Sequence, residues 1–418
     1  MKKHWRNNIL IKHKYFFLRI MSTLSGKRIR STLLCLDKEE NTDEKRIDIP
    51  FVDNEPLRKI LIRKIEYTTL MIIQKICSGE FPNVFVPNNY DKMESLESLE
   101  NDVNESDDKT LEFDEDDNSV NTTDNMDFCR KRSKNKLALM MKVMAMSHRL
   151  LITNTRITRR SFYYDLKNDI AGILVPTQKY IDLAVHDVAE LLNCAPWDLG
   201  LIATSKGLIA GNLTLYFMDK QTIDCNVPGG ALIPQIISNI ISIRAKAKFV
   251  LIVEKDSIFQ KLLEENTTEL LNCILITGKG YPDIGTRMLI KLLSEKLNIP
   301  IYIIVDADPF GMDIMCVYRF GSSTLSKEND SLACPKIRWL GIHPSELNVL
   351  GVKTISLSER DLSKLTSINS RHYMTEALLR QTRIMRRGKA EIEAISSFCR
   401  NFLTAIYISR KIKGNDYI

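Results

Sequence analysis

The feature that most constrains the fold is an alternation of short apolar runs with helical patterns that begins near residue 245. Three runs rich in β-branched residues, "KFVLIVE", "CILITG" and "PIYIIVD", are each followed by a segment with helical spacing. Strands that alternate with helices form βαβ units, in which helices cover both faces of a parallel sheet. Ligands bind such sheets at the carboxyl ends of the strands, so the side chains there are candidates for a functional site.

Acidic residues stand at two of these strand ends. Glu254 ends the first run, and Asp306 and Asp308 come at the end of the third, where residues two apart point to the same face. A single acid at a strand end is most simply explained as a cap of the following helix. Three carboxylates at one sheet edge repel one another unless a cation neutralises them, and Mg²⁺ prefers carboxylate oxygens. Together the three acids predict a magnesium site.

The run between these strands leads into "ITGKGYPDIGTR". Gly278 and Gly280 allow a backbone to approach a phosphate closely, and Lys279 and Arg287 add positive charge at the same edge of the sheet. A Gly-Lys-Gly loop is a weak signal by itself, but its place between two acidic strand ends favours a phosphate-containing ligand.

Upstream, helices come before two short β-like segments. We expect a helix over residues 134–152, a short helix that starts after the cap Thr158 and carries "RRSFYYD", and a third helix over residues 177–193. "GLIATS" and "NLTLYF" follow. Helices that close on a small hairpin are typical of a winged helix-turn-helix domain, which commonly binds DNA and in other cases forms only protein interfaces.

The N-terminal part contains one further predicted helix, over residues 55–80, before a strongly acidic stretch. Residues 91–128 hold fifteen acids and two lysines, so we expect a disordered insertion there. The predicted helix places apolar residues at helical spacing: Leu57, Ile60, Leu61, Ile65 and Leu70.

The charge balance favours a polyanionic partner. The 418 residues carry a net charge of +7, and outside the acidic stretch the charge is +20, which suits nucleic acid.

Nine scattered cysteines without a CxxC pair indicate reduced thiols inside the cell. No run reaches the roughly 18 apolar residues that span a bilayer, and the basic start predicts no signal peptide. Translation could begin at Met1 or Met21.

The motifs of the C-terminal half resemble a known family. "VEKD", "GKGYPDIGTR" and "DADPFG" are similar to the Toprim domain of the A subunit of topoisomerase VI and its eukaryotic relatives, the meiotic double-strand-break transesterases. "RRSFYYD" resembles the catalytic tyrosine motif of that family, and "TSKGLIAGN" and "IRWLGIHPSEL" also match. The resemblance covers residues 134–418, with a weaker match in the helix at 55–80.

The resemblance implies roles for individual residues. Tyr164 falls at the nucleophile and Arg160 at the assisting arginine, while Glu254, Asp306 and Asp308 match the ligands of Mg²⁺. Phe310 stands where relatives often have His, and Gly285 where they have Asn; neither change removes a carboxylate. For DNA binding we expect four basic residues: Arg159, Lys206, Lys279 and Arg287.

The family also implies an architecture. We expect an α/β protein with a winged helix, in which an N-terminal winged helix-turn-helix domain precedes a Toprim domain with a mainly parallel sheet flanked by helices. The predicted segments are a basic, disordered extension (1–54), a helical segment (55–90), the acidic insertion (91–128), the winged-helix domain (129–220) and the Toprim domain (221–418).

The implied activity is that of a type IIB topoisomerase-like enzyme in the nucleus. Attack by the tyrosine on double-stranded DNA would give a 5′-phosphotyrosyl link, and a homodimer with composite sites would break both strands during meiosis to initiate recombination. The sequence has no GxxxxGK[ST] loop, so ATP hydrolysis would come from a B-type partner subunit. Accessory recombination proteins are expected, and a membrane partner is not.

Three other functions fit the same motifs. A Toprim hydrolase would use metal and water, with Tyr163 and Tyr164 as packing residues. An inert DNA-binding scaffold would only recruit recombination proteins, although it need not keep the tyrosine and the three acids. A strand-passing topoisomerase of the same family outside meiosis would have the same fold and residues, so its partner would distinguish it.

Overall fold

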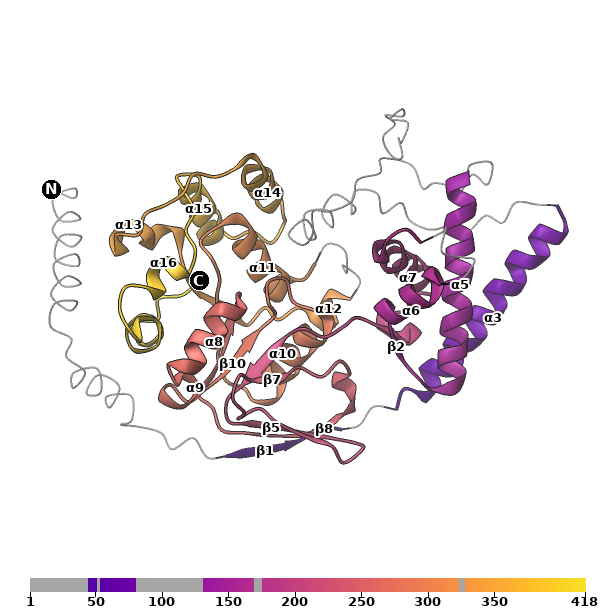
Figure 1. Ribbon diagram of the computed structural model, residues 1–418, viewed down its shortest axis with the longest axis horizontal. Helices are drawn as coiled ribbons and strands as arrows, with labels where there is room; N and C mark the ends of the chain where they lie inside the picture. Colours follow the sequence, from indigo (N-terminus) through magenta and orange to yellow (C-terminus); the bar gives the residue numbers. More distant parts are fainter. Residues whose placement is uncertain (1–43, 51–52, 80–130, 169–174, 323–327) are drawn as a thin grey trace. The chain divides into compact units, whose positions relative to one another are not determined.

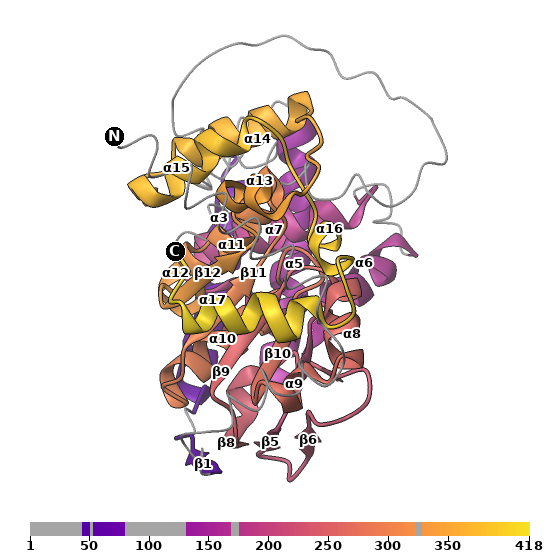
Figure 2. The same cartoon turned by 90° about the vertical axis from the view of Figure 1, so that its left-hand side faces the viewer.

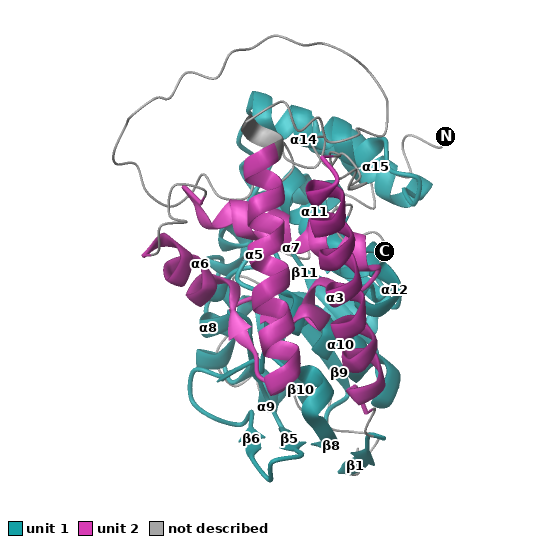
Figure 3. Cartoon of the chain, turned by 90° about the vertical axis from the view of Figure 1, so that its right-hand side faces the viewer, with its two compact units in different colours: residues 1–51, 205–418 teal, residues 52–204 magenta. Residues whose placement is uncertain are grey.

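The computed structural model describes residues 44–50, 53–79, 131–168, 175–322 and 328–418 (Figure 1). The chain divides into two compact units, formed by residues 1–51 with 205–418 and by residues 52–204 (Figure 3). Two of the expected segments lie outside the described residues: the acidic insertion at 91–128, and the part of the basic extension before residue 44. Among the described helices, none is long and apolar enough to cross a membrane.

The unit of residues 52–204 packs its helices around one apolar core that includes Met140, Phe162 and Val185. The helix predicted at 134–152 is confirmed, and Thr158 caps the short helix as predicted, because its Oγ1 accepts a hydrogen bond from Ser161 N at 3.0 Å. The elements are α3 (Glu55–Cys77), α5 (Lys131–Thr153), β2 (Ile157–Thr158), α6 (Arg159–Lys167), α7 (Gln178–Leu192), a 3-10 helix (Pro196–Leu199) and β3 (Leu201–Ile202).

Helix α3 confirms the predicted helix but buries a narrower face than the spacing indicates. Leu61 and Ile65 are buried, and Ile72 continues their stripe, whereas Leu57, Ile60 and Leu70 are exposed. The helix packs mainly against α5, so only the residues that face α5 are shielded from solvent.

The predicted hairpin between "GLIATS" and "NLTLYF" does not form. Strand β3, from the first segment, pairs in parallel with β2. Strand β5 (Leu213–Phe217), from the second, pairs with β6 and β8 of the other unit, because its alternate residues Leu213 and Leu215 enter that unit's core. The division between the units therefore falls after Thr204, whereas the sequence predicted a domain boundary at residue 220.

The main sheet of the unit formed by residues 1–51 and 205–418 has six strands, with the order β12-β11-β9-β10-β4-β7. The four strands from β12 to β10 are parallel, as the βαβ pattern predicts, and β4 and β7 are antiparallel additions. The strands are β4 (Leu208–Ala210), β7 (Ala231–Leu232), β9 (Phe249–Val253), β10 (Cys273–Thr277), β11 (Ile301–Ile304) and β12 (Ile337–Gly341).

Both faces of this sheet are buried, which explains why its strands read as continuous apolar runs. Alternate residues enter different cores: Val250 and Ile252 of β9 belong to one cluster, and Leu251 and Val253 to another. The helices of this unit are α8 (Asp256–Glu264), α9 (Thr267–Leu270), α10 (Ile284–Lys296), α11 (Pro309–Phe320), α12 (Asn329–Leu332), α13 (Leu347–Leu350), α14 (Glu359–Asn369), α15 (Glu376–Met385), α16 (Glu393–Ser396) and α17 (Ser409–Lys413), with a π-helix at Phe402–Ile408 and 3-10 helices at Ile237–Asn239 and Pro344–Glu346.

A second, antiparallel sheet has the order β1-β8-β5-β6. Its edge strand β1 (Lys45–Asp48) lies in the extension that the sequence predicted to be disordered, and it pairs with β8 (Ile240–Ala245) in a register that sets Lys45 opposite Ala245. Ile47 packs against the core of the larger unit. The fourth strand, β6, spans Thr222–Asp224. The correction has a physical cause, since Ile49 also packs against that core and its N donates to Ile241 O at 2.8 Å, so two apolar residues anchor the segment.

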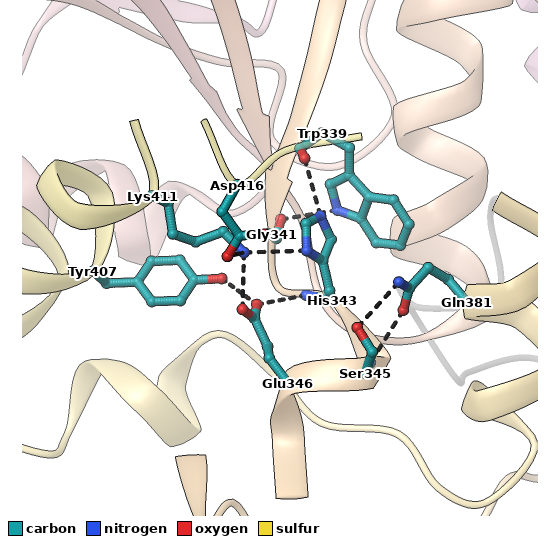
Figure 4. Close-up of polar contacts among 9 residues, drawn as sticks. All are labelled: Trp339, Gly341, His343, Ser345, Glu346, Gln381, Tyr407, Lys411 and Asp416. Atoms are coloured by element: carbon teal, nitrogen blue, oxygen red, sulfur yellow. Dashed lines mark hydrogen bonds and ion pairs between the residues drawn. The ribbon is translucent and has the colours of Figure 1, made fainter. Parts of the chain in front are cut away.

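The C-terminal residues return to the main sheet, where Ile418 exchanges backbone hydrogen bonds with Trp339 of β12 (2.8 and 3.0 Å). Figure 2 shows helix α17 in front of the parallel strands, and its Ile412 packs against the core on that face. In Figure 4, Lys411 of α17 reaches Glu346 Oε2 at 2.8 Å and His343 Nδ1 at 3.1 Å. This buried network fixes the end of the chain to the sheet.

Candidate active site

Three carboxylates meet where two neighbouring parallel strands end. Glu254 follows β9, and Asp306 comes two residues after β11, whose Ile304 is paired with Val253. Asp308 is the N-cap of α11, and its Oδ1 accepts a hydrogen bond from Gly311 N at 2.6 Å. The structure therefore brings together the three acids that the sequence singled out.

These acids are tied to the backbone around them. Glu254 Oε2 accepts a hydrogen bond from Asp306 N at 2.8 Å, and Asp306 Oδ1 accepts one from Ile392 N at 2.8 Å. A side chain at Gly311 would put its Cβ 2.6 Å from Asp306 O and 3.0 Å from Glu254 Oε2, so this position needs glycine. The hydrogen bonds hold the carboxylates in place before any ligand arrives.

The cluster carries more negative than positive charge. Burial, and then the charge of Asp306, raise the pKa of Glu254 to about 8. Burial also raises the pKa of Asp306 to about 6, against the opposing effect of the Ile392 backbone and of Lys255, and it raises the pKa of Asp308. The Lys255 ammonium lies 2.9 Å from Asp306 Oδ2, yet it also pairs with Glu391 and Glu393. The positive charge of Lys255 is thus shared among three acids.

This set of donors fits a divalent cation. Glu254 and Asp308 each use one oxygen in the hydrogen bonds above, so a second oxygen of each could bind a metal, with Asp306 beside them. Within the described residues no three His, Cys, Asp or Glu side chains are already arranged around one point. The Lys255 ammonium, a positive charge that the protein itself supplies, is paired with Asp306 Oδ2. A hard cation with oxygen ligands would relieve the repulsion described above.

The loop after β10 lies beside these acids. Lys279 and Gly280 adopt positive φ values of 54° and 86°, and Gly280 N donates to Glu254 O at 2.9 Å. The Lys279 side chain is exposed and lies 3.2 Å from Asp256, at the start of α8. Lys279 is therefore available to a ligand at this edge.

The other basic residues expected to bind DNA differ in their exposure. Lys206 is exposed, and its backbone N donates to Asp283 Oδ2 at 2.8 Å. Arg287 is only 3% exposed, and burial lowers its pKa to about 10. Because Arg287 lies on the buried face of α10, the structure does not offer it to DNA, and this corrects the expectation from the sequence.

The two adjacent tyrosines of α6 have different environments. Tyr163 is 9% exposed and donates to Pro176 O at 3.2 Å, whereas Tyr164 is 48% exposed. The Arg160 guanidinium lies 6.0 Å from the centre of the Tyr164 ring, one helical turn away. Tyr163 is thus a core residue, and Tyr164 is accessible from the solvent.

Arg159 has a structural role that the amino-acid sequence did not indicate. It is 6% exposed, its Nη1 lies 3.2 Å from Asp182 Oδ1, and its Nε contacts Leu201 O at 3.5 Å. It joins α6 to α7 and β3. This burial corrects the expectation that Arg159 binds DNA.

Several residues around the acids were missed by sequence reasoning. Lys255 was visible in "VEKD" but received no role, while Ile392 and Glu393 contact the site from a segment far along the chain. No local pattern marks such contacts. Gly311 could have been found, because it follows Asp308 at the first turn of a helix.

Comparisons with known proteins give two family models and several similar proteins. Residues 249–412 match the family model for the Toprim domain of Spo11 and of the topoisomerase 6 A subunit, and residues 135–201 match the model "Type IIB DNA topoisomerase". The chain is 38% identical over 296 residues to the meiotic recombination protein SPO11 of Homo sapiens, covering 69% of this chain and 74% of the human protein. It is 37% identical to the Mus musculus protein of the same name over the same shares, and 32% identical over 301 residues to a DNA topoisomerase 6 A subunit of Oryza sativa subsp. indica (70% of this chain, 66% of that protein).

Proposed function

The chain belongs to the family of the meiotic recombination protein SPO11 and the topoisomerase 6 A subunit, and we propose that it makes the DNA double-strand breaks that initiate meiotic recombination. The observation that carries the proposal is the pair of tyrosines on α6, of which only Tyr164 is exposed beside a cation. Since each chain offers one such tyrosine, a break in both strands needs two copies of the chain.

The proposed reaction is a transesterification. Tyr164 Oη attacks a DNA phosphorus atom, a bond forms between that oxygen and the 5′-phosphate, and the bond to the 3′ oxygen breaks. The phenol loses its proton, and the departing oxygen becomes a 3′-hydroxyl. A tyrosine with an ordinary pKa of about 10 needs a neighbouring positive charge to react at neutral pH, and Arg160 provides one.

The acids of the larger unit complete the proposal. Glu254, Asp306 and Asp308 would hold Mg²⁺, which supplies positive charge to the phosphate and the departing oxygen. Their hydrogen bonds to Asp306 N, Ile392 N and Gly311 N keep the carboxylates oriented. Lys279 and Lys206 are the basic residues that we propose to contact the DNA backbone.

We also propose that the unit of residues 52–204 is a winged-helix domain. The protein would act as a homodimer, in the nucleus. The family model over residues 135–201 and the topoisomerase 6 relative support a B-type partner subunit of the ATP-hydrolysing kind. Accessory recombination proteins would recruit the complex to chromosomes.

The test is recovery of the protein under denaturing conditions from meiotic cells that carry wild type, Tyr164→Phe or Tyr163→Phe. We expect DNA to be covalently attached to the wild type and to Tyr163→Phe, and none to Tyr164→Phe. Free 5′-phosphates that persist in Tyr164→Phe would favour the hydrolase. Breaks without any attached DNA in the wild type would favour the hydrolase or the scaffold, and breaks that are simply resealed in cells outside meiosis would favour the strand-passing enzyme.

A further inference from the structure

A tyrosine of the loop after β10 is bound to a buried acid that has no assigned role. Tyr281 Oη donates to Asp313 Oδ2 at 2.6 Å. Asp313 is 4% exposed and belongs to α11, the helix that Asp308 caps. Burial, and then the charge of Asp313, raise the pKa of Tyr281, so its hydroxyl keeps the proton that it donates. The bond joins the loop to the helix that starts at the acid cluster.

Asp313 is held in turn by two cations. Arg371 Nη1 lies 2.5 Å from Asp313 Oδ1, and Lys364 Nζ lies 3.3 Å from Oδ2. Both come from the segment of α14 and the residues that follow it. Because two cationic partners hold this buried carboxylate in one orientation, Asp313 is a fixed point to which Tyr281 can bind.

The other end of the loop is attached to the strand that carries Glu254. Gly280 N donates to Glu254 O at 2.9 Å, and Thr277 Oγ1 donates to the same carbonyl at 3.2 Å. Lys279 N donates to Thr277 Oγ1 at 3.1 Å. Lys279, in a left-handed conformation, therefore sits between two attachments, one to Glu254 after β9 and one to Asp313 of α11.

We propose that Asp313 is a positioning residue for DNA binding, which holds, through Tyr281, the loop that presents Lys279 to a DNA phosphate. The identity of the ligand rests on the proposed function, whereas the attachment of the loop does not. The alternative is that Asp313 serves only to neutralise Arg371 and Lys364. If Asp313 positions the loop, removal of the Tyr281 hydroxyl should loosen the loop. If Asp313 only neutralises the two cations, the loop should not change.

The structure provides a matched control. Tyr373 is half-buried like Tyr281, and its hydroxyl accepts a hydrogen bond from Arg371 Nη1 at 3.0 Å, but it lies outside the loop. Tyr281→Phe and Tyr373→Phe each remove one hydroxyl from the same cluster. Asp313 keeps both cations in either variant, so we expect both to fold.

The experiment measures amide hydrogen exchange of the full chain and its affinity for a double-stranded DNA fragment of random sequence. In Tyr281→Phe we expect about tenfold faster exchange at Lys279 and Gly280, weaker DNA binding and an unchanged melting temperature. Tyr373→Phe should leave the exchange of the loop unchanged. Equal exchange at the loop in the two variants, or a fall in stability that accounts for the whole effect, would overturn the proposal.

A second readout separates this proposal from the proposed function. Faster exchange in Tyr281→Phe with unchanged DNA affinity would refute the role of Asp313 in DNA binding, although the attachment of the loop would stand. Loss of covalent DNA in Tyr164→Phe tests the cleavage activity alone. The failure of one proposal can therefore be told apart from the failure of the other.

Discussion

Two clusters of charge in the same unit differ in the number of acids that surround one lysine. At the ends of β9 and β11, Glu254, Asp306 and Asp308 share the single ammonium of Lys255 with other acids, and the pKa values of the three carboxyls are raised. At the C-terminus, Lys411 lies between Glu346, Asp416 and the neutral ring of His343 (Figure 4).

The partners of the second cluster fit one another closely. His343 Nε2 donates to Trp339 O at 3.0 Å, which leaves Nδ1 to accept from the Lys411 ammonium. Tyr407 Oη and His343 N both donate to Glu346 Oε1. In the second cluster Lys411 pairs with one partly buried acid, Glu346, and one exposed acid, Asp416, so little negative charge is left unbalanced away from water. In the first cluster three acids lie around one lysine, and such a cluster gains more from a bound cation. The difference is consistent with the proposed role of the first cluster in binding a cation.

The largest effect is expected from Glu254→Gln. Glutamine keeps an oxygen that can accept from Asp306 N, but it removes a charge that is needed to bind a cation. We expect DNA cleavage to fall about a thousandfold, with no loss of folding stability, because a carboxyl with a pKa of about 8 is largely protonated at neutral pH without a cation, and glutamine resembles that neutral form. Covalent DNA and the urea midpoint measure the two properties, and a less stable Glu254→Gln protein would contradict the comparison.

The same substitution in the other cluster, Glu346→Gln, should act in the opposite way. It leaves the buried Lys411 without its closest acid, so we expect the free energy of unfolding to fall by about 3 kcal/mol. Cleavage per folded molecule should not change. Urea unfolding checks the first expectation, and an unaltered midpoint would show that the C-terminal network contributes little.

Magnesium should distinguish the clusters without any DNA. At a concentration of one hundred times its dissociation constant, a ligand that binds only the folded state stabilises it by about 2.7 kcal/mol. We expect Mg²⁺ to raise the melting temperature of the wild type and of Glu346→Gln, but not that of Glu254→Gln. Equal shifts in all three proteins would place the cation elsewhere.

The smallest effect concerns pH. Burial, and then the charge of Lys411, lower the pKa of His343 below its ordinary value of about 6.5. The unfolded chain therefore binds a proton more readily, so the stability from this group is complete above pH 6.5 and is lost as the pH falls. We expect at most about 1.4 kcal/mol for each unit by which the pKa is lowered. In His343→Gln, which cannot titrate, urea midpoints should decline less between pH 7 and pH 5.5.

The sequence predicted the parts of the fold that local patterns determine. The strands of "KFVLIVE", "CILITG" and "PIYIIVD" and the cap at Thr158 are present, and Glu254 meets Asp306 because their strands are neighbours. The wrong predictions share a cause, which is tertiary context. Strand β5 joined another sheet, because its alternate residues fit that core better than a local hairpin.

The buried arginines were beyond prediction for a similar reason. Charged side chains are normally exposed, so Arg159 and Arg287 were taken as surface residues. Only the folded structure brings Asp182 and Leu201 to Arg159, and the contact of Ile392 with Asp306 joins residues that no local spacing connects.

The pairing of β1 with β8 has a consequence for how the protein is made. Lys45 pairs with Ala245, about 200 residues later in the chain. At a synthesis rate of at most about 20 residues per second, β1 leaves the ribosome at least about 10 seconds before its partner exists. The residues of the other unit emerge during this interval and can fold first. The N-terminal strand, although the earliest to be translated, thus cannot pair until more than half of the chain has been made.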